Sequence, residues 1–147
     1  SGQYYRIAQN YAPTGDFSLT AKIAYMPTVN TMQCHLTAFT SNEADAVRST
    51  WSYSSNWLGA LETRDHNAWT TRATWVTSCQ PQVYLHLQRV AGTWTTWISF
   101  DGQGFKNTGS STKAITVHHI QIEMNNNSGN QKVRCGIDWV RRDWLFL

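Results

Sequence analysis

The chain has 147 residues, of which 41% are hydrophobic and only 14% are charged, and its formal net charge is +3. This length suits one domain with a sizeable hydrophobic core, so we expect residues 1–147 to form a single domain. The charged share lies well below the roughly 25% of an ordinary soluble domain. Thr, Ser, Asn and Gln carry the polarity instead, which is typical of extracellular or virion proteins.

Composition also disfavours two classes of partner. Basic residues are scattered along the sequence, whereas nucleic-acid binders gather Lys and Arg into a stripe that neutralises several phosphates. No apolar run approaches the roughly 20 residues that span a bilayer. We therefore expect neither nucleic acid as a partner nor insertion into a membrane.

Short strand-like segments recur along the whole chain, separated by turn residues and without a helical pattern. In chain order the expected strands are Gln3–Gln9, Asp16–Met26, Thr31–Thr40, Ala46–Ser54, Trp57–Thr63, Trp69–Thr77, Val83–Val90, Thr93–Phe100, Lys113–Met124 and Lys132–Trp139. Short strands at regular spacing with no helices between them predict an all-β fold, a two-sheet antiparallel β-sandwich.

Alternation of apolar and polar residues is clear in three of these segments, Asp16–Met26, Thr31–Thr40 and Val83–Val90. A period of two places alternate side chains on opposite faces of a strand. One face of each sheet therefore packs against the core, and the other is free to meet a ligand. Ala91-Gly92 and Asp101-Gly102 are expected to form tight turns with positive φ.

Three stretches resemble the concanavalin A-like lectin/glucanase (laminin G-like) domains. They are the run LHLQRVAGTWTTWISFDG at 85–102, the run GDFSLTAKI at 15–23 and the run CGIDWV at 135–140. The resemblance implies a jelly roll of two curved sheets, with a concave face that many members use for sugars. It implies no particular ligand, because this fold hosts lectins, glycosidases, adhesion modules and viral attachment domains.

Glycosidases of this superfamily carry a Glu-x-Asp-x-x-Glu strand that presents a nucleophile and a general acid on one side. The nearest match here is the run EADAVR at 43–48, in which Arg48 replaces the second Glu. Glu62 and Asp65 fall across an expected strand end and are interpreted as surface carboxylates. We therefore expect the chain not to be an enzyme.

Metal ligands are not grouped in the sequence. His118 and His119 are adjacent, so on a strand they point to opposite faces and cannot readily share an ion. Calcium needs several oxygen ligands, and the chain has only nine acidic residues. We expect no cofactor and no metal, and leave calcium open as the alternative.

The tryptophan content points to a function. Eight tryptophans occur in 147 residues, and sugars offer C–H faces that stack on indole rings while their hydroxyls bind Arg, Asn, Gln and His. The alternative is that most of these rings fill the space between two large sheets. The expected ligand-binding residues are Trp51, Tyr53, Trp57, Arg64, Trp69, Arg72, Trp75, His86 and Trp97.

These observations favour a non-catalytic carbohydrate-binding or receptor-binding module, part of a virion or phage tail attachment protein and located outside the cell or on the virion surface. The expected partner is a cell-surface glycan or glycoprotein, and a homo-oligomer could form through the parent protein. Two alternatives stay open at this point. One is a structural or assembly domain, because protein interfaces are also rich in Trp, Tyr and Arg; the other is a glycosidase with a non-standard acid pair.

Overall fold

The computed structural model describes residues 3–10, 12–24, 32–126 and 136–143, and this part of the chain contains eleven strands and no helix. The strands are β1 (Gln3–Gln9), β2 (Phe17–Ala24), β3 (Met32–Phe39), β4 (Ala46–Ser54), β5 (Asn56–Asp65), β6 (Ala68–Thr77), β7 (Val83–Val90), β8 (Thr93–Ser99), β9 (Lys106–Ser111), β10 (His119–Asn126) and β11 (Gly136–Asp143). Consequently the described residues include no helix able to cross a membrane.

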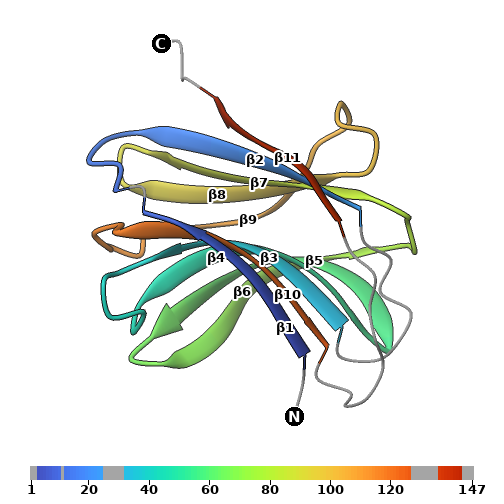
Figure 1. The fold of residues 1–147 in the computed structure, drawn as a ribbon, viewed down its shortest axis with the longest axis horizontal. Helices are drawn as coiled ribbons and strands as arrows, with labels where there is room; N and C mark the ends of the chain where they lie inside the picture. The colour runs from blue at the N-terminus through green and yellow to red at the C-terminus, as the bar shows by residue number, and fades with distance from the viewer. Residues whose placement is uncertain (1–2, 11, 25–31, 127–135, 144–147) are drawn as a thin grey trace.

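The strands form two sheets that lie face to face as two layers (Figure 1). One sheet has six strands in the order β1-β10-β3-β4-β5-β6, and the other has five in the order β11-β2-β7-β8-β9. Every pairing is antiparallel. The predicted all-β fold, a sandwich of two antiparallel sheets, is confirmed.

The core lies between the two sheets and follows the predicted alternation. On β3, Met32, Cys34, Leu36 and Ala38 face the core, and on β2 and β7 the aliphatic residues do the same. The buried core residues are Phe17, Leu19, Ala21, Ile23, Met32, Cys34, Leu36, Ala38, Val47, Trp51, Val83, Leu85, Leu87, Trp94, Ile98, Val117, Ile120, Ile122 and Met124. Burial of this apolar surface supplies the main driving force for the sandwich.

The turns at 91–92 and 101–102 are confirmed by positive φ angles of 47° at Ala91, 77° at Gly92 and 80° at Gly102. Asp101 holds the second turn, because its Oδ1 accepts hydrogen bonds from the backbone amides of Gln103 and Gly104. These bonds lower the pKa of Asp101 to about 2.

Two expected strand boundaries were wrong, and one strand was not expected. The strand expected at Lys113–Met124 begins only at His119, because residues 112–118 join no sheet ladder. The sequence 106–111 forms β9, which its polar composition gave no reason to expect. The closing strand extends to Asp143, past its expected end at Trp139. Its expected start, at residues 132–135, lies outside the described part of the chain.

Edge strands β6 and β9 approach each other closely at Gly109, which has a φ of 137°. A Cβ atom at this position would lie 2.6 Å from the Cβ of Ala73 on β6 and 3.1 Å from the Cβ of Leu61 on β5. The approach therefore requires glycine, both for its backbone angle and for the space.

We expect Gly109→Ala to lower the free energy of unfolding by about 2 kcal/mol or more, because it adds backbone strain and a steric overlap. Urea denaturation measures the loss. Gly15→Ala is the matched control, since no atom lies within 4 Å of a Cβ built there. Equal stability of the two variants would show that the close approach of β9 to β6 is not required.

Candidate functional site

The face of the six-stranded sheet that points away from the five-stranded sheet, here called the outer face, is polar. The register places His35 opposite Thr50, and Arg48 opposite Glu62. Glu62 in turn lies opposite Thr71 on edge strand β6. Side chains on alternate positions of neighbouring strands are close enough to interact, so β3, β4, β5 and β6 together present one continuous polar strip.

Arg48, Glu62 and Trp69 form a compact group on this face, here called the Arg48–Glu62–Trp69 cluster. The Nε of Arg48 donates to Oε2 of Glu62 at 2.7 Å, and the guanidinium carbon lies 3.6 Å from the centroid of the Trp69 ring. Side-chain exposure is 9% for Arg48 and 15% for Glu62. Burial lowers the pKa of Arg48, while the charge of Glu62 opposes that effect.

Both carboxylate oxygens of Glu62 accept hydrogen bonds. The hydroxyl of Thr50 donates to Oε2 at 2.8 Å, and the hydroxyl of Thr71 donates to Oε1 at 3.1 Å. These bonds offset the cost of removing the ion pair from water. They also fix the carboxylate in one position, so that Glu62 is a pre-arranged acceptor at the surface.

The indole of Trp69 is held from several sides. Phe39 meets it edge-on with ring centroids 6.4 Å apart, and the guanidinium carbon of Arg64 lies 5.6 Å from the ring centroid. Trp69 nevertheless stays only half-buried, because β6 is the edge strand of the sheet. A rigid, partly exposed aromatic ring thus borders a fixed ion pair.

Polar atoms without hydrogen-bond partners lie in the centre of the outer face. Nδ1 of His35 donates to the hydroxyl of Thr50 at 3.0 Å, because that hydroxyl gives its own proton to Glu62, and Nε2 of His35 has no partner among the described residues. The hydroxyl of Thr37 and both amide atoms of Gln121 are likewise buried and unpaired there. Burial lowers the pKa of His35 well below its ordinary value, so its ring is neutral. Unpaired buried polar groups are costly, and these atoms lie beneath the surface, because His35 and Thr37 are 0% exposed and Gln121 is 1% exposed.

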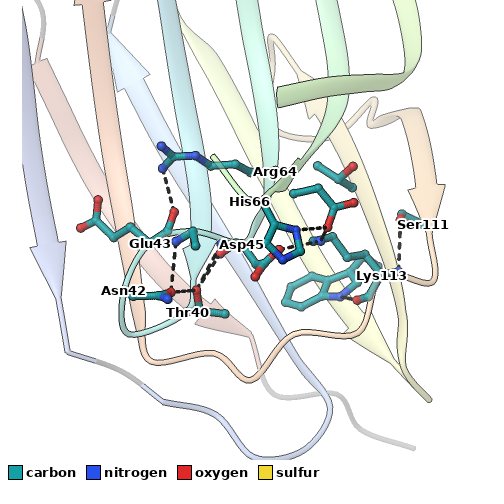
Figure 2. A network of polar contacts seen from close by, with 12 residues as sticks. Thr40, Asn42, Glu43, Asp45, Arg64, His66, Ser111 and Lys113 are labelled. Atoms are coloured by element: carbon teal, nitrogen blue, oxygen red, sulfur yellow. Dashed lines mark hydrogen bonds and ion pairs between the residues drawn. The ribbon is translucent and has the colours of Figure 1, made fainter. Parts of the chain in front are cut away.

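The turn between β3 and β4 is held by Arg64 of β5 (Figure 2). Nη1 of Arg64 donates to the backbone oxygen of Glu43 at 2.8 Å. The carboxylate of Glu43 pairs with Arg6 at 3.0 Å and lies 3.3 Å from Nε2 of His119. Glu43, which has a φ of 58°, therefore connects β1, β10 and β5 at one end of the outer face.

Lys113 holds the neighbouring turn, between β5 and β6, in place. Its Nζ lies 3.0 Å from Oδ1 of Asp45 and 2.6 Å from Oδ1 of Asp65 (Figure 2). The hydrogen bond from Lys113 lowers the pKa of Asp45. Asp45, Asp65 and His66 are grouped closely enough to hold a cation, but the ammonium group of Lys113 already compensates both carboxylates. A calcium ion at this group would have to displace Lys113.

The structure distributes the expected ligand-binding residues over separate locations. Arg64 and Trp69 lie on the outer face of the six-stranded sheet, opposite each other in the register. His86 and Trp97 lie on the outer face of the other sheet, where their rings meet edge-on at 5.1 Å. Arg72 lies at a bulge in β6, where the register with β5 shifts by one residue, and its Nε donates to the hydroxyl of Thr63 at 2.8 Å.

Four of the expected aromatic residues point toward the space between the two sheets. Trp51 has an exposed fraction of 0% and is part of the core, so its assignment to an open site was wrong. Trp57 and Trp75 are packed against the same core, and Tyr53 stacks on Trp57 with centroids 4.5 Å apart. The cause is the parity of β4 and β5, which turns these rings toward the second sheet.

Sequence reasoning missed Arg48 and Glu62 as site residues. In the sequence, Arg48 stands out only as a break in an acidic motif, and the position of Glu62 indicates a surface carboxylate. Their pairing depends on the register of β4 with β5, which no local pattern specifies. The sequence offers one signal for Arg48: it and Thr50 occupy alternate positions of β4, which places both side chains on the same face.

No family model and no curated protein matches this chain. Among solved structures it is similar to the exoplasmic/lumenal domain of VIP36, solved with Ca²⁺ and Man3GlcNAc, at 9% identity and a TM-score of 0.74, covering 99% of this chain and 76% of that one. It is also similar to the GH43 protein BlXynB of Bacillus licheniformis, at 13% identity and a TM-score of 0.72, covering 86% of this chain and only 27% of that one. A third similar structure is the CBM2 module of the evolved Dit of Lactobacillus casei BL23 phage J-1, at 8% identity and a TM-score of 0.61, covering 91% of this chain and 64% of that one.

These likenesses establish the fold, which is that of concanavalin A-like lectin domains. The chain spans about a quarter of the GH43 protein. It covers most of the lectin domain of VIP36. The similarity therefore concerns one β-sandwich and not a whole glycoside hydrolase.

We expect Lys113→Met to raise the pKa of Asp45 toward its ordinary value of 3.8, because the hydrogen bond that lowers it is lost. A depressed carboxyl pKa stabilises the fold above the ordinary value and ceases to do so as pH falls through the folded value. Carboxyl NMR titration measures the pKa, with Lys106→Met, an exposed lysine of β9, as the control. An unchanged Asp45 titration in Lys113→Met would contradict the assigned ion pair.

Proposed function

We propose that residues 1–147 act as a single, non-catalytic carbohydrate-recognition domain that binds a glycan on the outer face of the six-stranded sheet. The observation that carries this proposal is the Arg48–Glu62–Trp69 cluster. It combines an aromatic ring, a guanidinium and a carboxylate in fixed positions on a polar sheet face.

The chemistry of a sugar matches these three groups. A pyranose has an apolar C–H face, which contacts the exposed part of the Trp69 ring. Its hydroxyls are both donors and acceptors, so they can donate to the carboxylate of Glu62 and accept from the guanidinium of Arg48. Thr71, which is exposed beside them on β6, supplies a further hydroxyl. Because the groups are already hydrogen-bonded to one another, little conformational entropy is lost on binding.

The distribution of apolar residues favours a ligand over a protein partner. Large exposed hydrophobic residues in the described part of the chain are Ile7 on β1, Val76 on β6 and Phe105 between β8 and β9. These three positions belong to separate elements. Of the tryptophans whose side chains the structure describes, Trp51 and Trp94 lie in the core and Trp57 and Trp75 pack against it. An assembly domain would present its apolar residues as one patch.

The arrangement of Glu62 also favours binding over hydrolysis. A glycosidase needs one carboxyl group that delivers a proton to the leaving oxygen, whereas both oxygens of Glu62 accept hydrogen bonds. The lectin-like similarity covers most of this chain, and the similarity to the GH43 protein covers a small part of that enzyme. Both points support a non-catalytic role.

The proposed parent is an attachment protein on a virion or phage tail, and the proposed partner is a cell-surface glycan or glycoprotein. The weakly charged, Thr- and Asn-rich composition supports this, as does the similarity to a module of a phage J-1 Dit protein. A location outside the cell or on the virion surface follows from it. In such a parent, several copies of this domain would act together, because other parts of the parent protein would form the oligomer.

We expect the chain to bind glycans on an array, and Trp69→Ala to weaken the tightest interaction by roughly tenfold or more, about 1.4 kcal/mol. The matched control is Trp97→Ala, which removes a partly buried tryptophan from the outer face of the opposite sheet. Isothermal titration with the best array ligand measures both affinities.

Two results would contradict the proposed site. If Trp97→Ala abolishes binding while Trp69→Ala retains it, the glycan binds to the five-stranded sheet. If the array shows no carbohydrate ligand for the folded chain, carbohydrate recognition itself is wrong. Thermal unfolding of both variants shows whether a loss of binding reflects a loss of fold.

We expect no hydrolysis when the chain is incubated with its array ligand or with β-glucans and xylans, because Glu62 is held in an ion pair with Arg48 and is not placed to deliver a proton. Assays for newly formed reducing ends check this outcome. Release of reducing sugar that disappears in Glu62→Gln would replace the binding proposal with a glycosidase.

A further inference from the structure

A pocket of about 530 Å³ lies apart from the outer face, on the side of the sandwich where edge strands β6 and β9 meet. Hydroxyl side chains of Thr93 and of residues 110–112 line it, together with Arg72 and the ion pair of Lys113 with Asp65. No aromatic ring lines this pocket. Its walls therefore consist almost entirely of hydrogen-bonding groups.

A bulge in β6 directs Arg72 into this pocket. Glu62 pairs with Thr71 and Leu61 pairs with Ala73, so Arg72 is the extra residue between them. Bulges re-aim side chains and are frequent beside binding sites. The guanidinium is then fixed by the bond from its Nε to the hydroxyl of the buried Thr63, at 2.8 Å. Its two terminal nitrogens have no hydrogen-bond partner among the described residues.

A second irregularity, in β9, forms the opposite wall. The register between β8 and β9 shifts so that Asn107 pairs with Trp97 and Gly109 pairs with Thr96. Oδ1 of Asn107 accepts from the amide of Gly109 at 2.8 Å and stabilises this shift. Because Gly109 contacts β6 closely, the two edges of the sandwich meet there, and Ser110 follows directly after that contact as part of the pocket wall.

The charges around the pocket compensate one another. Lys113 contacts both Asp45 and Asp65 through its Nζ, and Arg72 supplies the second positive charge. The side chain of Asp65 is 58% exposed, so a bound anion would meet its negative charge. A neutral ligand with several hydroxyls avoids this repulsion and can use the donors of Arg72 and the hydroxyls of the walls together.

We propose that this pocket is a second binding site, specific for a neutral polyol such as one saccharide unit, with Arg72 as its anchoring residue. Two adjacent hydroxyls of a sugar ring are spaced so that each can accept a hydrogen bond from one terminal nitrogen of the same guanidinium. This inference does not depend on the glycan site proposed for the outer face, since the two sites share no residue.

The test follows two reporters in one NMR spectrum of the full chain, the Nε–H of Arg72 and the indole N–H of Trp69. The probes are glucose, galactose and mannose as neutral sugars, with glucuronate and inorganic sulfate as anions. We expect at least one neutral sugar to shift the Arg72 resonance with saturation, and the anions to bind no more tightly than that sugar.

Variants separate the pocket from the outer face. We expect Arg72→Met to weaken binding at the pocket about tenfold or more, because hydrogen bonds to a charged group are lost. The pocket's response would then be read on Ser110 and Thr112 amides. Ser110→Val, at an exposed position, should also weaken it, whereas Lys106→Met, also on β9, should not. Ser110→Val keeps the test informative if Arg72→Met does not fold.

Each outcome decides one of the two proposals. A shift of Arg72 without a shift of Trp69 supports the pocket and leaves the outer face without support. A shift of Trp69 alone overturns the polyol pocket and leaves the proposed function standing. Tighter binding of glucuronate or sulfate at Arg72 would overturn the polyol assignment in favour of an anion site.

Discussion

Every strand of this sandwich must give one side to the layer between the sheets, and the rest of the structure depends on that constraint. On β3 the aliphatic set faces inward, so His35, Thr37 and Phe39 face outward by parity alone. The same rule on β4 turns Arg48 outward and Trp51 into the core. Burial of the aliphatic residues determines the register of the strands. That register brings the polar side chains of neighbouring strands together on the outer face.

The outer face is held by electrostatics rather than by apolar contact. Arg48 and Glu62 are largely removed from water, which costs free energy, and hydrogen bonds from Thr50 and Thr71 offset part of that cost. Unpaired polar atoms of Gln121 nearby add a further cost. Apolar groups would be more stable here, and a polar face is what the proposed binding site requires.

The fold could be predicted where alternation is strong, as on β2, β3 and β7, and where turn residues are distinctive, as at Ala91-Gly92. Site residues could not, because β4 and β5 place the polar residues Ser49 and Thr63 on the same inward side as Trp51. The apolar residues of β4 and β5 therefore do not show which face of each strand is buried, and the sequence does not assign each tryptophan to a face. The bulge at Arg72 lies beside the close approach of β9 to β6, a contact between residues distant in sequence that no local pattern encodes.

A crystal structure of the chain with its tightest array glycan tests the central claim most directly. The account predicts a sugar ring against the indole of Trp69, with hydroxyls bonded to Arg48 and Glu62. A glycan seated instead on the five-stranded sheet beside Trp97 and His86, with the outer face of the six-stranded sheet empty, would contradict it.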